Sequence, residues 1–314
     1  MKFSKSVGIV SYGTYIPIAR ITGEQIAQSY GEHHTSAPKQ LGVYSKSVPA
    51  VDEDTITMAV EAGSQCLKDW TPRQRAQIGA LFIGSESHPY AVKPSGTVVA
   101  NALGLPETLA MADLQFACKA GIQALLLCAA YSVAGMATYG LAVGSDTAQA
   151  EKGDVLEFTA SAGAACFGVG TTRLRARLIG ALSIATDTPD FWRKPGYDHP
   201  HHAGRFSGEP GYFAHTILAA QKLMKELSLQ PSSVDYCVFH TPNAKFPKVA
   251  AHKLGFTPQQ LQYSLPVETI GNTYSAAVMI ALAQVLDHAK KRDRILLTSY
   301  GSGSGSDALF LEVQ

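Results

Sequence analysis

The feature that most constrains the fold of this chain is an internal repeat. In each half, an apolar strand-like run ends at a polar cluster, and a helix, a short apolar stretch, a second helix and a final strand follow. Glu86 and His240 each come just after the first strand of their half, and Cys118 and Asn272 each stand at the start of the second helix. The interval from Glu86 to Cys118 equals that from His240 to Asn272, 32 residues in both. We interpret the chain as a duplicated α/β unit.

A duplicated unit of this kind predicts a layered molecule. Strands that alternate with helices are typical of α/β folds. Two units packed face to face would give five layers, α/β/α/β/α, with residues 1–165 forming the first half and residues 166–314 the second. Ligands bind preferentially at the carboxyl ends of strands in α/β sheets, so we expect Glu86, Cys118, His240 and Asn272 to converge on one site.

Composition argues against several other classes of protein. The 26 basic and 25 acidic residues leave a net charge of +1, so bulk charge favours neither nucleic-acid nor membrane-surface binding. The five cysteines are odd in number and form no CxxC pair, which indicates a reducing cytoplasm rather than a disulfide framework. The N-terminus lacks the apolar core of a signal peptide. The apolar run from Ile122 to Val143 is rich in Ala, Gly, Ser and Tyr, and predicts a buried helix that leads into a strand.

Cys118 is the first candidate for chemistry. It lies in FACKAG, where small neighbours leave room for a substrate, and at a helix start, where unpaired N–H groups and the helix dipole favour a thiolate and lower the pKa of a thiol. A buried structural cysteine is the alternative interpretation. The four other cysteines lie in apolar or amphipathic runs and are expected in the core; they are Cys66, Cys128, Cys166 and Cys237.

Three polar residues could assist a nucleophile. His240, after the strand YCVF, suits a general base or an oxyanion donor, or it is simply a loop histidine bonded to the backbone. Asn272 in GNTYSAA suits a helix N-cap, which is compatible with a catalytic role. Glu86 is either a solvated loop residue or, if partly buried, a carboxyl with a raised pKa that can act as acid and base near neutral pH.

Other polar segments give weaker signals. The stretch SYGSGSGSD at 299–307 lacks the Gly-Lys-[Ser/Thr] of a P-loop, and indicates either close backbone approach to a substrate or a tight turn. Lys245 and Lys248 are candidates for contacting phosphates, with a solvated helix start as the alternative. His199, His201 and His202 do not have the spacing of metal ligands, and we expect no metal there.

Several stretches together resemble the hydroxymethylglutaryl-CoA synthases of the thiolase superfamily, especially the compact archaeal type. They stand in family order across nearly the whole chain, and they are KSVP and DEDT within 46–55, GSESHPYAVKP at 84–94, FACKAG at 116–121, PDFWR at 189–193, GRFSGEPGYF at 204–213, FHTPNAKFP at 239–247, GNTYSAA at 271–277 and SYGSGSGSD at 299–307. The resemblance implies a thiolase-like fold. It also implies condensation of acetyl-CoA with acetoacetyl-CoA, with no metal or redox cofactor beyond the coenzyme A thioesters.

The resemblance also implies a role for each matching residue. Cys118 would carry the acetyl group as a thioester. Glu86 would take a proton from the acetyl methyl and later supply the proton of the new alcohol. His240 would hold and polarise the acetoacetyl thioester. The remaining matches would bind substrate or coenzyme: Asn272, Arg205, Ser207, Ser302 and Thr159 in the substrate pocket, and Lys245 and Lys248 at the coenzyme A phosphates.

Departures from the family pattern leave the acyl specificity open. Ser207 stands where the family typically has Thr, Thr241 replaces a larger polar residue, and Cys166 occupies a small-residue position. The alternative is another condensing enzyme or acyltransferase of this fold, similar to a ketoacyl synthase, with a different donor or acceptor or with carrier-protein substrates. Glu86 distinguishes the two, because ketoacyl synthases do not need a carboxylate there. A non-enzymatic supporting subunit is a third interpretation, which the intact set of polar residues disfavours.

The resemblance extends to partners and pathway. By analogy we expect a cytoplasmic homodimer whose sheets meet edge to edge, acting in isoprenoid synthesis by the mevalonate route. A complex with acetoacetyl-CoA thiolase through a small bridging protein would pass the thioester between enzymes.

Overall fold

The fold is built on one continuous sheet made of two similar halves. The structure is a computed structural model that describes every residue except 2, 31–35, 148–149 and 304, and the side chain of 205. Nine strands follow the order β11-β12-β13-β8-β1-β7-β6-β4-β5. The first-half strands are β1 (Gly8–Tyr15), β4 (Ile78–Gly84), β5 (Ala110–Leu114), β6 (Tyr139–Thr147) and β7 (Ala162–Gly170). The second-half strands are β8 (Ala176–Ala185), β11 (Tyr236–Phe239), β12 (Arg294–Thr298) and β13 (Gly305–Val313).

The two half-sheets meet where β1 and β8 cross. These strands pair over only two positions, Gly8 with Arg177 and Ile9 with Ala176. A side chain at position 8 would collide with the Ala176 carbonyl, since a Cβ there would lie 2.0 Å from that oxygen. Elsewhere each half keeps its own ladder, with parallel pairing in its first crossover, β4 with β6 and β11 with β12.

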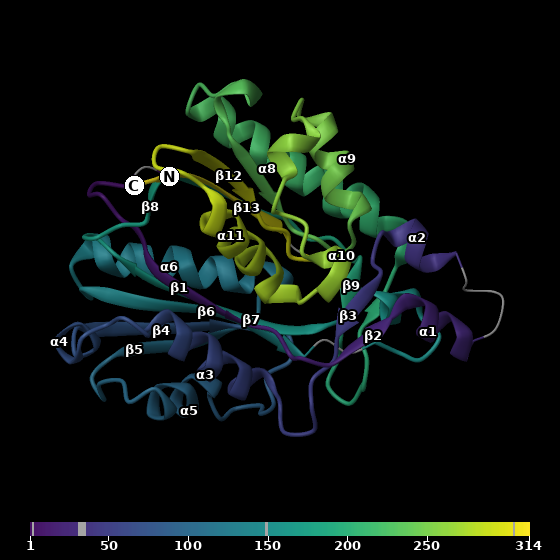
Figure 1. The fold of residues 1–314 in the computed structure, drawn as a ribbon, viewed down its shortest axis with the longest axis horizontal. Helices are drawn as coiled ribbons and strands as arrows, with labels where there is room; N and C mark the ends of the chain where they lie inside the picture. The colour runs from purple at the N-terminus through teal and green to yellow at the C-terminus, as the bar shows by residue number, and fades with distance from the viewer. Residues whose placement is uncertain (2, 31–35, 148–149, 304) are drawn as a thin grey trace.

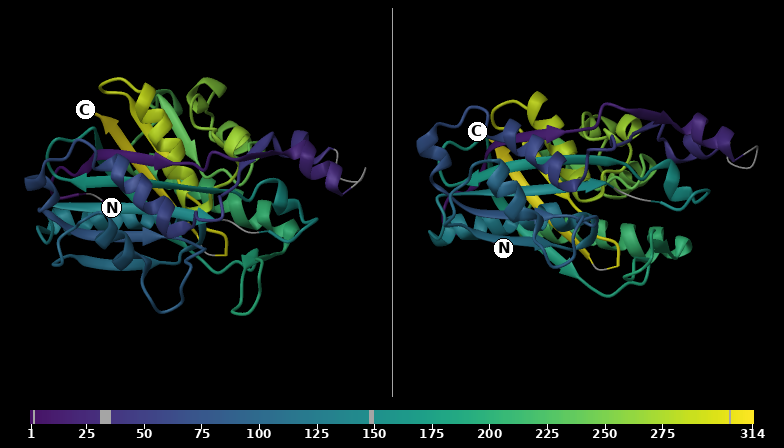
Figure 2. Two further views of the ribbon diagram at one scale, coloured as in Figure 1. Left: turned by 60° about the horizontal axis from the view of Figure 1, so that its bottom comes forward. Right: turned by 90° about the horizontal axis from the view of Figure 1, so that it is seen from below.

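Helices fill the space between the half-sheets and cover their outer faces (Figures 1 and 2). The middle layer holds α6 (Ala120–Ala134) and α11 (Ala277–His288), which carry few polar residues and contribute many side chains to the central core. The first outer layer holds α3 (Thr55–Cys66), α4 (Pro72–Arg75) and α5 (Ser95–Ala102), and the second holds α8 (Phe213–Glu226) and α9 (Lys245–Lys253). The predicted five-layered α/β/α/β/α arrangement is confirmed.

Smaller elements gather at the end of the molecule where β4 and β6 finish (Figure 1). They are β2 (Arg20–Thr22), α1 (Gly23–Ser29), α2 (Ala37–Leu41), β3 (Ser45–Ser47), the hairpin of β9 (Phe191–Trp192) and β10 (His201–His202), α7 (Gly204–Phe206) and α10 (Val267–Ile270). These elements place loops over the carboxyl ends of the strands, where a site was expected.

The long apolar run is a core helix, as predicted. Within the described residues, Ala117–Ala134 is the one helical stretch long and apolar enough to cross a membrane, and 61% of it is buried inside the protein. It continues through a short turn into β6, and all five cysteines, including Cys128 on this helix, are buried and free.

The repeat is less regular than the sequence suggested. The expected division between residues 165 and 166 falls inside β7, and we propose that the halves divide at the turn 171–175 that follows it. Among the described residues the second half has no counterpart of β5. The corresponding stretch contains Pro266, which has no N–H to donate to a ladder, and it forms α10 instead.

The equivalence of Cys118 and Asn272 is wrong by three residues. Each middle helix is preceded by a 3₁₀ turn, Ala117–Lys119 before α6 and Tyr274–Ala276 before α11. Both turns begin at a non-glycine residue with positive φ, 46° at Ala117 and 51° at Tyr274. Ser275 is therefore the structural partner of Cys118, and the equal 32-residue intervals do not reflect the superposition of the halves.

Candidate active site

Cys118 occupies a strained turn in the wall of a cavity. It follows Ala117, whose left-handed backbone costs about 1 kcal/mol or more in a non-glycine residue and is a known feature of functional sites. The cavity has a volume of about 240 Å³. Six predicted site residues line it: Cys118, Thr159, Ser207, His240, Asn272 and Ser302. The structure thus brings together residues from both halves, as the convergence of strand ends predicted.

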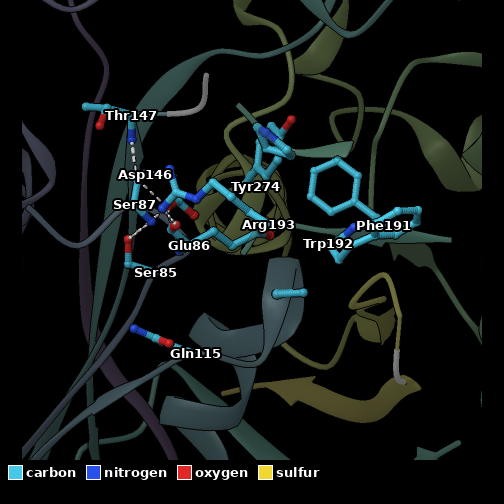
Figure 3. Close-up of a pocket in the computed structure, with 12 residues that line it drawn as sticks. Ser85, Glu86, Ser87, Gln115, Asp146, Thr147, Phe191, Trp192, Arg193 and Tyr274 are labelled. Atoms are coloured by element: carbon cyan, nitrogen blue, oxygen red, sulfur yellow. Dashed lines mark hydrogen bonds between the residues drawn. The ribbon is translucent and has the colours of Figure 1, made fainter. Parts of the chain in front are cut away.

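Glu86 reaches the same centre from a second cavity. This space of about 250 Å³ lies on the β4 and β6 side, and Figure 3 shows Glu86 with Arg193, Phe191 and Tyr274 around it. Phe191 and Tyr274 line both cavities, so their rings form the partition between them. The site therefore has one chamber on the Cys118 side and a more polar chamber on the Glu86 side.

Asp146 holds the loop that carries Glu86 (Figure 3). Its Oδ1 accepts hydrogen bonds from the Ser85 hydroxyl at 2.8 Å, the Glu86 N–H at 2.8 Å and the Ser87 hydroxyl at 2.7 Å. Its Oδ2 accepts from the Ser275 N–H at 2.9 Å, which joins this loop to the start of α11. These four hydrogen bonds hold the loop in one position.

Glu86 and Cys118 influence each other directly. Burial, followed by the charge of Asp146, raises the pKa of Glu86 to about 8, while a hydrogen bond with the Cys118 thiol and the charge of Arg193 oppose this rise. Oε1 of Glu86 is buried and has no hydrogen-bond partner. The interpretation of Glu86 as a partly buried carboxyl with a raised pKa is confirmed.

The expected lowering of the Cys118 pKa is wrong. Burial raises the pKa of this thiol well above its ordinary value, and the neighbouring carboxyls of Glu86 and Asp146 raise it further. Burial and the two neighbouring carboxyl groups outweigh the helix dipole here, and a short 3₁₀ turn separates Cys118 from the first turn of α6. In the resting site Cys118 is therefore a neutral thiol.

His240 is a neutral imidazole on the opposite wall. It follows β11, is 1% exposed, and burial lowers its pKa to about 3. Its backbone is held on both sides, because its N–H donates to the Thr298 carbonyl and its carbonyl accepts from the Tyr212 hydroxyl. Nδ1 is buried without a partner. A neutral imidazole can donate a hydrogen bond to a carbonyl oxygen, which suits polarising a thioester or ketone.

Asn272 lies beside it on the turn before α11. Its Oδ1 accepts a hydrogen bond from the Tyr274 N–H at 3.0 Å, so it supports the turn as a capping residue does. Its backbone bridges to the segment of Thr159, whose carbonyl accepts the Asn272 N–H at 2.7 Å. These contacts place both residues on one wall of the Cys118 cavity.

Sequence reasoning missed the charged pair beneath the nucleophile. Lys119 is 3% exposed at its side chain, and its Nζ lies 2.8 Å from both carboxylate oxygens of Asp307, which is fully buried. The pair ties the Cys118 turn to the glycine-rich segment, since a Cβ at Gly301 would lie 2.9 Å from the Lys119 chain. The apolar residues on both sides of FACKAG do not indicate whether Lys119 is buried or exposed.

A second missed carboxylate orders the same segment. Asp190 is 1% exposed and accepts a hydrogen bond from the Tyr300 hydroxyl at 2.7 Å and another from the Gly303 N–H. Tyr300 and Ser302 line the Cys118 cavity. For Asp146 and Asp307 the sequence did offer a signal, because each stands in an otherwise apolar or glycine-rich run, where a carboxylate must find buried donors.

Comparison with known proteins decides the family. Residues 224–313 match the 3-oxoacyl-[acyl-carrier-protein (ACP)] synthase III C-terminal domain. The chain is 49% identical over 307 residues to the hydroxymethylglutaryl-CoA synthase of Methanopyrus kandleri, an alignment that covers 97% of this chain and 87% of that protein. It is 49% identical over 308 residues to the synthase of Methanocaldococcus jannaschii, covering 98% and 88%. The chain belongs to the hydroxymethylglutaryl-CoA synthase family.

Solved structures confirm the thiolase-like fold. A crystal structure of an HMG-CoA synthase complexed with CoA superposes with a TM-score of 0.89 at 22% identity, covering 98% of this chain and 82% of that one. The 3-oxoacyl-(acyl carrier protein) synthase III of Pseudomonas aeruginosa superposes with a TM-score of 0.87 at 17% identity, covering 98% of each chain. As a member of the synthase family, the protein is an enzyme of the condensing acyltransferase type.

Two of the remaining predicted binding residues, Lys245 and Lys248, lie outside the cavity. Lys245 and Lys248, at the start of α9, line a neighbouring surface groove with Lys39. Leu41 lines both this groove and the Cys118 cavity, which makes them adjacent. Lys248 is already paired, its Nζ lying 2.7 Å from Glu268. Arg205 belongs to α7, but its side chain lies outside the described part of the chain.

The histidine cluster does not assemble. His201 stacks on Trp192 at a ring separation of 6.3 Å, whereas the His202 ring contacts Asp154. Among the residues that the structure describes, no group of three or more His, Cys, Asp or Glu side chains is placed to hold a metal ion.

Proposed function

We propose that this protein condenses acetyl-CoA with acetoacetyl-CoA to give hydroxymethylglutaryl-CoA. The observation that carries the proposal is the contact between the Glu86 carboxyl and the Cys118 thiol, with the pKa of Glu86 raised to about 8. A base whose pKa lies close to neutral pH can both remove a proton and return it. Ketoacyl synthases need no carboxylate at this position, so Glu86 favours the synthase reaction over that alternative. Relatives named as hydroxymethylglutaryl-CoA synthases at 49% identity support it further.

Each residue then has a defined part in the reaction. Cys118 takes the acetyl group as a thioester, which splits one difficult acyl transfer into easier steps. Glu86 removes a proton from the acetyl methyl, and the resulting carbanion attacks the ketone of acetoacetyl-CoA. The protonated Glu86 then supplies the proton of the tertiary alcohol. His240, with Asn272 beside it, holds and polarises the acetoacetyl group, and hydrolysis of the Cys118 thioester releases the product.

The test is mass spectrometry of the protein after incubation with acetyl-CoA alone, followed by an acetoacetyl-CoA chase. We expect acetyl on the peptide that contains Cys118, and its discharge into hydroxymethylglutaryl-CoA. Cys118→Ser is expected to abolish the adduct, while Cys237→Ser, a buried cysteine on β11 outside the site, keeps it. An acetyl group absent from Cys118, or unaffected by the chase, would contradict the proposal.

The raised pKa of Glu86 predicts a rising pH profile. Because the base must be ionised, condensation by pre-acetylated enzyme should increase as pH rises through about 8. Acetylation removes the thiol hydrogen bond that lowers this pKa, so the inflection should not move below 8 on that account. Rapid-quench measurement of product gives the profile. A range of roughly pH 6 to 9 spans the ionisation of Glu86. A flat profile over this range would show that Glu86 is ionised throughout.

The groove beside the cavity suits the coenzyme. We place the coenzyme A phosphates against Lys245 and Lys39. Lys248 lines the same groove but would contribute less, because its ammonium already contacts Glu268. Arg205, Ser207, Ser302 and Thr159 would contact the acyl and pantetheine parts of the substrate. Lysines bind phosphates as point charges, so the KM for acetyl-CoA should rise in Lys245→Ala and with added salt. An unchanged KM in both experiments would exclude this placement.

We infer partners and location by analogy with the family. We propose a homodimer formed along the free edge of β5, the last strand of the sheet, because an unpaired edge is a template for another strand. Sedimentation of the purified protein as a monomer would contradict it. A complex with acetoacetyl-CoA thiolase and a bridging protein, a cytoplasmic location and a place in the mevalonate pathway are further parts of this proposal, testable by co-purification from the source organism. The reaction uses coenzyme A thioesters and no other cofactor.

A further inference from the structure

A histidine in the wall of the Cys118 cavity is paired with an aspartate. His202, on β10, lines this cavity, and its Nε2 lies 3.0 Å from Oδ2 and 3.2 Å from Oδ1 of Asp154. The two side chains are partly exposed, 20% for His202 and 28% for Asp154. The proposed roles of Cys118, Glu86 and His240 make no use of this pair.

Each member of the pair is linked to a residue that packs around Cys118. His202 stands opposite Phe191 in the β9–β10 hairpin, and Phe191 packs against the cluster formed by Cys118, Ala160 and Tyr274. The charge of Asp154 acts on Tyr274, a member of that cluster. The pair therefore borders the same small space as the acyl group that Cys118 would carry.

Asp154 is itself rigidly placed. It begins the 3₁₀ turn Val155–Phe158, and its Oδ1 accepts a hydrogen bond from the Leu156 N–H at 2.7 Å. Val155 and Leu156 line the cavity too. A carboxylate fixed in this way can hold one orientation of the imidazole across the gap between the hairpin and the turn.

The pair has the arrangement of a general base and its orienting group. When Nε2–H donates to a carboxylate, the lone pair of Nδ1 is left to accept a proton, and the imidazolium that forms is stabilised by the same carboxylate. His240 lacks this support, because its Nδ1 is buried without a partner. Among the described histidines that line the cavity, His202 is the one with a carboxylate partner.

We propose that His202, oriented by Asp154, is the general base for hydrolysis of the acyl-Cys118 thioester, the last step of the proposed function on which this inference rests. A water molecule gives one proton to Nδ1 of His202 while its oxygen bonds to the thioester carbonyl carbon. The carbon–sulfur bond then breaks, and the imidazolium returns the proton to the Cys118 sulfur. The products are the carboxylic acid and the free thiol, with no other reactant consumed. Asp154 is a positioning residue in this step.

Glu86 is the alternative general base for the hydrolysis, and the two candidates predict different results when His202 is replaced. Glu86 meets the sulfur from the other cavity and acts in the carbon–carbon bond-forming step. If Glu86 also activated the water, loss of His202 would leave hydrolysis intact. If His202 is the base, its loss should spare acetylation and condensation and block only release.

The experiment follows the species on Cys118 by rapid quench and intact mass spectrometry during a single turnover with acetyl-CoA and acetoacetyl-CoA. The variants are His202→Gln, which keeps a donor for Asp154 but cannot accept the proton, and Asp154→Asn, which keeps the cap. His201→Gln is the matched control, because His201 is the neighbouring residue of the same strand and stacks outside on Trp192. His202→Asn serves as a second variant if the first fails to fold.

The expected result is acetylation of Cys118 within about 2-fold of wild type in all variants, together with an accumulated condensed adduct in His202→Gln that hydrolyses about 10²-fold more slowly. Asp154→Asn should show a smaller accumulation of the same adduct, which a purely structural role would not produce, and His201→Gln none. Release at the wild-type rate from His202→Gln would overturn the inference and leave the proposed function standing. Absence of acetyl-Cys118 in the wild type would overturn the proposed function itself.

Discussion

Glu86→Gln is expected to slow condensation by about 10³-fold while Cys118 still accepts acetyl from acetyl-CoA. Glutamine has the shape of the carboxyl but can neither remove the methyl proton nor return it to the alkoxide. The adduct on Cys118 should therefore persist after an acetoacetyl-CoA chase in the variant and disappear in the wild type. Glu107→Gln, at an exposed carboxylate before β5, is the matched control and should behave as wild type. Normal turnover by Glu86→Gln would exclude the assigned mechanism.

The same substitution should change stability in a pH-dependent way. The folded-state pKa of Glu86 is raised from 4.5 to about 8, so the stability that its protonated form contributes is full below 4.5 and is lost as pH rises through about 8. Glutamine does not ionise and escapes this loss. The quantity to compare is the free energy of unfolding of Glu86→Gln minus that of the wild type. This difference should be about 2 kcal/mol larger near pH 8 than at pH 4.5. The value is smaller than the full pKa shift implies, because Glu86 is partly exposed. Urea titrations at both pH values measure the difference, and an equal difference at the two would contradict the raised pKa.

Lys119→Met is expected to destabilise the fold by about 3–5 kcal/mol, because it leaves the Asp307 carboxylate buried without its partner. The ammonium of Lys119 is the cation that lies 2.8 Å from both oxygens of that carboxylate. Lys222→Met, at an exposed position on α8, is the control and should change stability little. Denaturant unfolding at fixed pH measures the effect.

The double variant Lys119→Met/Asp307→Leu separates stability from positioning. Replacing a buried ion pair by apolar residues of similar volume is often neutral, so folding should be largely restored. Acetylation of Cys118 should stay slow, because the segment from Ser299 to Gly303 has Tyr300 as its one large side chain and depends on polar contacts for its place. If Lys119→Met were as stable as the wild type, the ion pair would contribute nothing to stability. If the double variant acetylated Cys118 at the wild-type rate, the ion pair would not position the site.

The layered fold followed from patterns that are local in the sequence. Strand and helix periods, the polar residue after each strand and the repeated order of elements predicted β4, α6, β6, β11, α11 and β12 close to where they lie. These patterns are strong because each strand buried on both faces is continuously apolar, as in the run that forms β4. The short proline-containing stretch before α11 was harder, since it is apolar enough for a strand and only its missing N–H decides against one.

The meeting of Glu86, Cys118, His240 and Asn272 could be predicted for a related reason. Strand ends and helix starts in equivalent halves face the same region, so residues at those positions converge whatever their side chains are. The resemblance to the synthase family added Thr159, Ser207 and Ser302 as predicted substrate-binding residues, and the structure places all three on the wall of one cavity.

The sequence by itself thus determined the layers, the candidate nucleophile and the set of polar groups around it. Only the tertiary structure decided the charge state of those groups, because a pKa depends on burial and on charges that are distant along the chain. The helix start at Cys118 favours a thiolate, yet Glu86 and Asp146, 32 residues before and 28 residues after it, reverse the direction. The pairings of Lys119 with Asp307 and of His202 with Asp154 join segments 188 and 48 residues apart, and no local pattern specifies which buried charges will meet.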